Sequence, residues 1–283
     1  MFSGSAHPEL AAEICAALGE PLLPVRLRRF ANDCLEVQLQ SNCRERDVFL
    51  IQTLAPPVQE HLVEFLLMLD AARGASAARV TAVIPHYAYA RSDKKHMPRI
   101  SIGARLVADL LVTAGASRVL AMTLHASQVH GFFSVPVDHL HALRELAGHF
   151  RGQDLANTVV VSPDLGNAKN AAAFASMLGL PVAAGAKERF DDEKVRITSI
   201  IGDVDGKNVI VLDDEIARGT TTIELLDRLR EHGVTSVRIA CTHGLFAAGM
   251  TSKLIVLSVA PALAEAIRRI HWGESVSALF GQH

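Results

Sequence analysis

Residues 208–226 read NVIVLDDEIARGTTTIELL, and this stretch decides the fold class. The β-branched apolar run at residues 209–212 predicts a strand, which ends on two adjacent acids, Asp213 and Asp214. Small residues beginning at Gly219 then lead into an amphipathic pattern with helical spacing. A strand that passes through a short loop into a helix is the repeating unit of α/β proteins, so the stretch predicts that class.

The same order recurs along the chain. An apolar strand pattern at residues 79–85 is followed by a helical pattern at 101–115, which ends on a glycine, and by a second strand pattern at 117–126. These three segments predict one βαβ unit. Further strands are predicted at 157–164 and 236–244, and further helices at 168–179 and 221–233. We therefore expect mostly parallel central sheets flanked by helices.

The polar stretch HFRGQDLANT (149–158) weakly marks a domain boundary near residues 140–155. It divides the chain into an N-terminal α/β domain, residues 1–145, and a C-terminal α/β domain, residues 146–283, whose last helix can pack back on the first domain.

Composition narrows the class of protein. The 283 residues are 49% hydrophobic and 20% charged, and the formal net charge is -2, which disfavours nucleic acid as a partner. No run approaches the roughly 20 apolar residues of a membrane span, and the first ten residues lack the pattern of a signal peptide. The four cysteines form no C-x-x-C pair, so free thiols are expected rather than a zinc site or disulfides. We expect a cytoplasmic protein.

Polar residues follow most of the predicted strands at their carboxyl ends. In open parallel sheets, ligands bind beyond these ends, so several candidates point to one edge, although polar residues also mark where a strand leaves the core. The candidates are His86, His125, Asp164, Asp213 and His243.

The loop after the two acids suits a phosphorylated sugar. Its small residues and the start of the following helix present free N–H groups to a phosphate, and Thr220 and Thr221 add hydroxyl donors. Asp213 and Asp214 are acceptors that can hold sugar hydroxyls directly or through Mg²⁺. The alternative is an ordinary N-capped helix after an acidic turn.

The stretch VIVLDDEIARGTT resembles the sugar-phosphate loop of type I phosphoribosyltransferases and of phosphoribosyl-diphosphate synthases, also called ribose-phosphate pyrophosphokinases. The resemblance to the synthases extends nearly from end to end. It is carried by AVIPHYAYARSDKK (82–95), RLVADLLVTAGASRVLAMTLHASQVHGFF (105–133), VVVSPDLG (159–166), ACTHGLF (240–246) and VLSVAPALAEAIRRIHWGESVSALF (256–280).

The resemblance implies two similar domains of the type I phosphoribosyltransferase kind. It implies transfer of the diphosphoryl group of Mg-ATP to ribose 5-phosphate, with phosphoribosyl diphosphate and AMP as products and Mg²⁺ as cofactor. The first domain is expected to bind ATP and to make subunit contacts, and the second to carry the ribose-phosphate loop. The implied assembly is a homo-oligomer built from dimers, with a hexamer as one form, in which a neighbouring subunit lends part of the ATP pocket.

The resemblance also implies roles for individual residues. The catalytic cations are Lys187 and Arg189, on a mobile loop. The metal ligands are His125 and Asp164. The residues implied for ATP are Phe30, which packs on the adenine of an adjacent subunit, Arg91, Ser92, Asp93 and His125. Those implied for ribose 5-phosphate are Asp213, Asp214, Arg218, Gly219, Thr220 and Thr221.

The sequence departs from the family pattern at several of these places. Asn32 and Cys34 replace two carboxylates near the adenine site, and Ser92 replaces a longer glutamine. Thr123 stands where an acid precedes His125, and Thr220 lacks the backbone freedom of the usual glycine. A helix and a strand that the family carries near residues 247–253 are missing.

Two other functions stay open. The altered adenine motif and the missing segment favour a catalytically weakened homologue that assembles with a true synthase. Ala217 in the loop favours a phosphoribosyltransferase.

Overall fold

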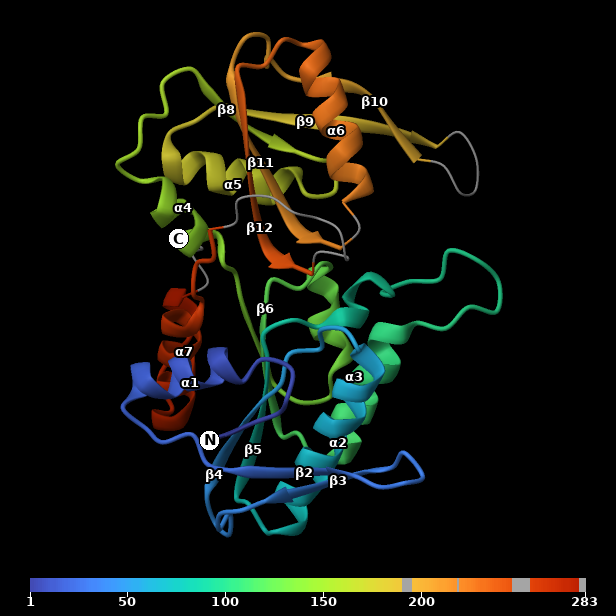
Figure 1. Cartoon of the computed structure of the whole chain (residues 1–283), viewed down its shortest axis with the longest axis vertical. Helices are drawn as coiled ribbons and strands as arrows, with labels where there is room; N and C mark the ends of the chain where they lie inside the picture. The colour runs from blue at the N-terminus through green and yellow to red at the C-terminus, as the bar shows by residue number, and fades with distance from the viewer. Residues whose placement is uncertain (190–194, 218, 246–254, 280–283) are drawn as a thin grey trace. The chain divides into compact units, whose positions relative to one another are not determined.

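The computed structural model describes residues 1–189, 195–217, 219–245 and 255–279, with the backbone alone at residues 187–189 and 195–196. The chain divides into two compact units (Figure 1). The first contains Met1–His141 together with Ser258–His283, and the second contains Ala142–Leu257. The last helix therefore belongs to the first unit. Each unit is described below by itself.

The first unit is built on a parallel sheet of five strands. The strand order is β1-β4-β5-β6-β7. All four pairings are parallel, as the predicted βαβ unit requires. The strands are β1 (Phe2–Ser3), β4 (Asp47–Ile51), β5 (Arg79–Ile84), β6 (Arg118–Met122) and β7 (Val137–Leu140). The helices are α1 (Pro8–Leu18), α2 (Val58–Gly74), α3 (Gly103–Ala114) and α7 (Ala260–Trp272), with short 3-10 turns η1 (Ala88–Arg91), η2 (Ser127–Phe132) and η3 (Ser277–Leu279).

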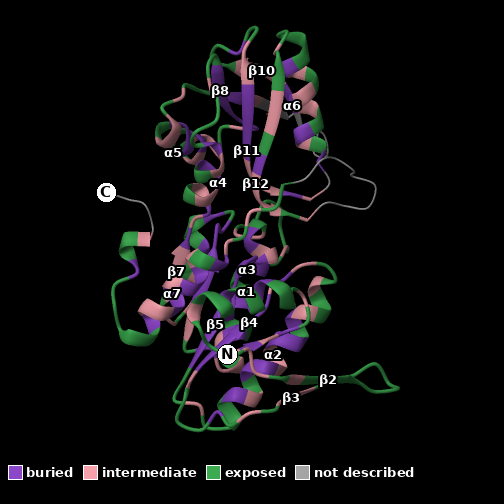
Figure 2. Ribbon diagram, turned by 60° about the vertical axis from the view of Figure 1, so that its left-hand side comes forward, coloured by how far each residue is buried: buried purple, intermediate pink, exposed green. Residues whose placement is uncertain are grey.

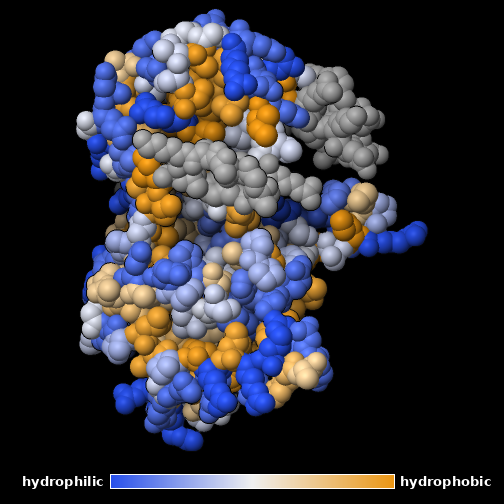
Figure 3. Space-filling view, viewed as in Figure 1, coloured by the Kyte–Doolittle hydropathy of each residue, from blue (hydrophilic) through white to orange (hydrophobic). Residues whose placement is uncertain are grey.

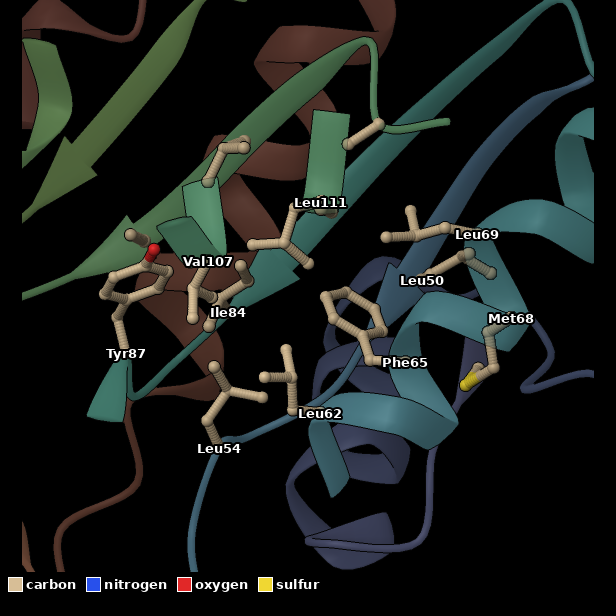
Figure 4. Packing of buried hydrophobic residues seen from close by; sticks show 14 of the residues in the cluster. Leu50, Leu54, Leu62, Phe65, Met68, Leu69, Ile84, Tyr87, Val107 and Leu111 are labelled. Carbon is tan, nitrogen blue, oxygen red and sulfur yellow. The ribbon is translucent and has the colours of Figure 1, made fainter. Parts of the chain in front are cut away.

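Both faces of this sheet are covered by helices. Leu50 and Ile84 pack against Phe65 and Leu69 of α2 and Leu111 of α3 (Figure 4). The alternate side chains on the strands are buried as well, and α1 and α7 lie together on the side opposite α2 and α3 (Figure 1). Burial of both faces explains the nearly continuous apolar strand sequences.

A separate hairpin projects from the first unit. Strands β2 (Val25–Arg29) and β3 (Leu35–Leu39) pair with each other in antiparallel fashion and form their own two-stranded sheet. Most residues of β2 are exposed, and the hairpin is largely green in Figure 2. An ion pair between Arg29 and Glu60 joins the hairpin to α2.

The second unit has a sheet with the strand order β10-β9-β8-β11-β12, in which only the pairing of β9 with β10 is antiparallel. Its strands are β8 (Thr158–Ser162), β9 (Val182–Arg189), β10 (Val195–Ile201), β11 (Asn208–Ile216) and β12 (Ser236–Gly244). Its helices are α4 (Leu143–Phe150), α5 (Ala168–Leu178) and α6 (Thr220–Glu231).

Alternation along the strands divides the core of the second unit in two. Val160 and Ile210 face α4 and α5, where Phe174 is fully buried. Their neighbours Val159 and Val209 face α6 on the other side of the sheet. Side chains two residues apart on a strand point to the same face, so the apolar run of β11 serves both layers.

The α/β class and the mostly parallel sheets with flanking helices are as predicted. The four cysteines are free, as predicted. None of the helices in the described part of the chain is long and apolar enough to cross a membrane. On the face seen in Figure 3, hydrophobic side chains are interspersed with hydrophilic ones. Several large apolar side chains are exposed, among them Leu165, Ile223 and Trp272.

We expect Phe174→Ala to lower the free energy of unfolding of the second unit by about 3–5 kcal/mol, because the fully buried ring leaves a cavity next to Phe150. Ile223→Ala, at a side chain that is 54% exposed, is the control and should change it by less than about 0.5 kcal/mol. Urea unfolding followed by circular dichroism measures both. Equal effects of the two variants would contradict the assigned core.

Candidate active site

The two acids lie on the part of β11 that extends beyond β8. The last pair between these strands is Val211 with Val161, whereas β11 continues beside β12, with Asp213 opposite Cys241. Asp213 and Asp214 are half-buried, and Oδ1 of Asp213 accepts a hydrogen bond from the Asp214 N–H at 2.9 Å. The carboxylates therefore lie at the carboxyl edge of the sheet, where parallel sheets bind ligands.

The acids make this edge electrostatically negative. Burial, together with the charges of Asp213 and Asp214, raises the pKa of the Cys241 thiol to about 12. The thiol is thus neutral at physiological pH. A ligand that presents hydroxyl donors or a cation is favoured next to the carboxylates.

Helix α6 begins directly after the acidic strand. Gly219 has a φ of 73°, a left-handed conformation that glycine adopts without strain, and its carbonyl accepts the first helical bond, from Ile223 at 2.8 Å. The first N–H groups of a helix have no partner within the helix and attract anions. Thr220 is the first residue of α6 and has helical backbone geometry. The backbone freedom of glycine is therefore needed at Gly219 and not at Thr220. Arg218 lies outside the described residues.

Asn167, which the sequence analysis did not identify, connects Asp164 to this edge. Oδ1 of Asp164 accepts from the Asn167 N–H at 3.1 Å. The Asn167 side-chain amide donates to the carbonyl of Leu212 at 3.0 Å, directly before Asp213. Asn170 in turn donates to the Asn167 side-chain oxygen at 2.9 Å. The second unit therefore brings Asp164, Asp213 and the α6 start to one edge of its sheet.

Lys187 and Arg189 lie in strand β9 rather than in a loop, so the expected loop position is wrong. Their backbones pair with Ile197 and Val195 of β10. Their side chains lie outside the described residues.

In the first unit, the residues implied for ATP follow β5. Arg91 ends η1, and the Ser92 hydroxyl accepts from the Gly103 N–H at 2.9 Å, at the start of α3. Asp93 accepts a hydrogen bond from Gln128, two residues into the turn that follows His125. This bond joins the Arg91–Asp93 segment to the His125 segment.

Two of the three histidines expected at strand ends, His86 and His125, differ in environment. His86 is 4% exposed and its Nδ1 lies 3.1 Å from the carbonyl of Leu54, which is typical of a core histidine. His125 is exposed at the carboxyl end of β6. Just before it, Leu124 donates its N–H to Nε2 of His139 at 2.8 Å, a contact that the sequence analysis did not predict.

Phe30 lies at the tip of the β2–β3 hairpin. Its ring is 38% exposed and the Arg28 guanidinium carbon lies 4.8 Å from its centroid. Asn32 accepts the N–H of Cys34 in the same turn. The hairpin that carries Phe30 is a sheet of its own, separate from the five-stranded sheet of this unit.

Comparisons with known protein families match both units. Residues 1–115 match the N-terminal domain of ribose phosphate pyrophosphokinase, and residues 137–259 match the phosphoribosyl transferase domain. The chain belongs to the ribose-phosphate pyrophosphokinase family. The first match includes the expected Phe30 and Arg91, and the second includes both acids of β11.

Individual relatives agree with this family. A Streptomyces coelicolor protein named "Putative ribose-phosphate pyrophosphokinase" is 69% identical, over 99% of this chain and 96% of that protein. A ribose-phosphate pyrophosphokinase of Deinococcus radiodurans is 47% identical, over 99% and 97%. The crystal structure of phosphoribosylpyrophosphate synthetase from Mycobacterium smegmatis superposes with a TM-score of 0.89 at 38% identity, covering 96% of this chain and 98% of that one.

The alignments also bear on the missing segment. The match to the Streptomyces coelicolor protein spans 306 positions, which is more than the 283 residues of this chain. That relative therefore has residues without counterparts here. The expected place of the omission, residues 247–253, lies outside the described residues.

We expect Gly219→Ala to lower the free energy of unfolding by about 1–2 kcal/mol, because alanine is strained at a φ of 73°. It should also weaken sugar-phosphate binding by distorting the start of α6. Gly148→Ala is the matched control: Gly148 is in α4 with nothing near an added Cβ, so alanine should raise stability by about 0.5–1 kcal/mol. Urea unfolding and calorimetric titration measure the two effects. Unchanged binding by the Gly219 variant would exclude the proposed phosphate position.

Proposed function

We propose that this chain transfers the diphosphoryl group of ATP to the anomeric hydroxyl of ribose 5-phosphate, giving phosphoribosyl diphosphate and AMP. The observation that carries the proposal is the edge of the second unit, where Asp213 and Asp214 lead through Gly219 into the open N-terminus of α6. This edge pairs acceptors for sugar hydroxyls with donors for a phosphate. Family membership supplies the reaction class.

The sugar phosphate is bound in two places. The carboxylates of Asp213 and Asp214 accept hydrogen bonds from the ribose hydroxyls, and the backbone N–H groups of Gly219, Thr220 and Thr221 donate to the 5-phosphate. Arg218 adds a positive charge beside the phosphate. Holding both ends of the sugar fixes the anomeric hydroxyl for attack, which is the main contribution a protein makes to phosphoryl transfer.

The first unit supplies the ATP-binding residues. The Arg91 guanidinium binds the phosphates of ATP. Asp93 accepts a hydrogen bond from Gln128, in the segment that follows His125. The anomeric oxygen forms a bond to the β-phosphorus and loses its proton to water, while the bond from that phosphorus to the α,β-bridging oxygen breaks and AMP leaves with that oxygen. Lys187 and Arg189 neutralise the charge that develops on the transferred group.

The residues present also fit Mg²⁺. Carboxylate oxygens are preferred ligands of this ion, which usually takes its other ligands from substrate phosphates and water. Asp164 would hold it, with Asp213 and Asp214 at the same sheet edge of the second unit, and His125 is the other residue that we propose as a ligand. When bound, the ion would neutralise phosphate oxygens of ATP. Among the described residues, no group of three or more His, Cys, Asp or Glu side chains could hold a metal ion by itself. The phosphates of ATP would therefore provide part of the coordination.

A second candidate is a catalytically weakened homologue that assembles with an active synthase. It is favoured by Ser92, whose hydroxyl is bonded to the start of α3, and by Asn32 and Cys34, which bond within the hairpin turn. These three residues offer the nucleotide base fewer hydrogen-bond partners than the two carboxylates and the glutamine that the family carries at the same positions. The third candidate, a phosphoribosyltransferase, is disfavoured by the match of residues 1–115. The expected cytoplasmic location stays a prediction.

An assay with Mg-ATP and ribose 5-phosphate tests the proposal directly. Wild-type protein should form AMP and phosphoribosyl diphosphate in equal amounts, and Lys187→Ala should lower kcat by about 10²–10³-fold while ribose 5-phosphate binding changes little. Lys207→Ala is the control, because Lys207 pairs with Asp203 before β11, at the opposite end of that strand from Asp213. A folded wild-type protein that binds ribose 5-phosphate but makes no product would favour the weakened homologue.

We also propose a homo-oligomer in which Phe30 serves the ATP site of a neighbouring subunit. Phe30→Ala should raise the KM for ATP by about tenfold, since base–aromatic stacking contributes about 1–3 kcal/mol. Co-expression of Phe30→Ala and Lys187→Ala subunits should restore sites with the wild-type kcat/KM for ATP, which neither variant has alone, because a mixed pair contains one complete site. Sedimentation velocity checks the assembly. A fully active monomer, or no recovery in mixed oligomers, would contradict the proposal.

A further inference from the structure

His139 lies beside the His125 segment but has no part in the proposed reaction. It is on β7, the outer neighbour of β6, and its Nε2 lies 2.8 Å from the backbone nitrogen of Leu124. A backbone N–H can only donate, so Nε2 must be the unprotonated, accepting nitrogen of the ring. His139 therefore binds the backbone immediately before His125.

The segment that His139 binds has an unusual backbone. Thr123 has a φ of 44° and is 7% exposed. A positive φ is strained for a β-branched residue and persists only where surrounding contacts enforce it. The Thr123 N–H donates to the carbonyl of Leu140 at 2.7 Å. Two successive N–H groups, those of Thr123 and Leu124, are thus held by two successive residues of β7.

The surroundings of His139 keep its ring neutral. Burial lowers the pKa of His139 to about 3, and the neighbouring His141 and His130 act in the same direction. The rings of His139 and His141 lie 4.3 Å apart. Because the imidazole is uncharged at physiological pH, its Nε2 is available as an acceptor.

We propose that His139 is a positioning residue, which fixes the strained turn at Thr123 and thereby the place of the His125 side chain. The proposal deepens the function proposed above, since it rests on the role of His125 in the binding of ATP and Mg²⁺. His139 touches neither substrate in this proposal and acts through the backbone of Leu124.

Two substitutions distinguish the effect of losing the accepting nitrogen from the effect of losing the volume of the ring. His139→Leu removes the acceptor with a side chain of similar size, whereas His139→Gln offers an amide oxygen at about the reach of Nε2. His141→Leu is the control, because it removes the neighbouring ring and leaves the bond from Leu124 in place. His139→Met, a flexible side chain and a weak acceptor, is a second removal variant if leucine fails to fold.

Amide hydrogen exchange at Leu124 reports the bond without requiring activity. Exchange should be at least about tenfold faster in His139→Leu than in the wild type, and close to wild type in His139→Gln and His141→Leu. An unchanged Leu124 amide in His139→Leu and His139→Met would overturn the proposal. This measurement stands even if the wild-type protein has no synthase activity, so failure of the proposed function would be recognised separately.

Kinetics tests whether the bond acts through His125. His139→Leu should lower kcat/KM for ATP by about tenfold, and His139→Gln should recover it to within about threefold of the wild type. In a His125→Ala background, His139→Leu should add less than about a twofold loss, because coupled residues are not additive. The proposal would be overturned if His139→Leu lowered kcat/KM as much in the His125→Ala background as in the wild type, or if His139→Gln did not recover it. His139 would then contribute only to the stability of the fold.

Discussion

The parallel pairing of β11 between β8 and β12 is the constraint on which the candidate site depends. From Val209 to Leu212, β11 is covered on both faces by α4, α5 and α6, so apolar residues are favoured there. Where β8 ends, one neighbour is gone, and polar side chains become possible. Asp213 and Asp214 take these first positions. The chemistry of the site is thus located by the difference in length between two adjacent strands.

A strand end is a weak place to hold functional groups, because its ladder of hydrogen bonds is incomplete. Each unit compensates with one side chain from the neighbouring element. In the second unit, Asn167 at the start of α5 donates to the carbonyl of Leu212. In the first, His139 of β7 accepts from the N–H of Leu124. Both bonds act on the residue directly before the proposed ligand, Asp213 or His125.

Part of the regular structure was predicted, because apolar runs and glycine stops are local signals. Strands β5, β6, β8 and β12 and helices α3 and α5 fall within the expected segments, and α6 begins one residue before the expected range of 221–233. The two antiparallel pairs were not predicted, since β2 alternates with arginines and β9 ends on charged residues, and neither pattern signals a buried sheet.

The site was predicted only in part, and the missed residues share one property. The acids and Gly219 are recognisable because their chemistry is local to one loop. Asn167 and His139 act across 45 and 15 residues of sequence, so nothing adjacent to them indicates the partner. Asn167 looks like an ordinary helix start, and His139 looks like one of several strand histidines. Their roles follow from strand register, which a single sequence determines poorly.

The bonds that hold these two segments also come from different directions. The His125 segment is held from β7, the strand outside β6. Among the described residues of the second unit, no strand lies outside β12, but the acids of β11 do not depend on one. They are supported by β12 itself and, through Asn167, by the helix that follows β8. A chain that lacks residues present in its relatives can therefore keep the edge proposed to bind the sugar phosphate, because that edge is held from within the described sheet.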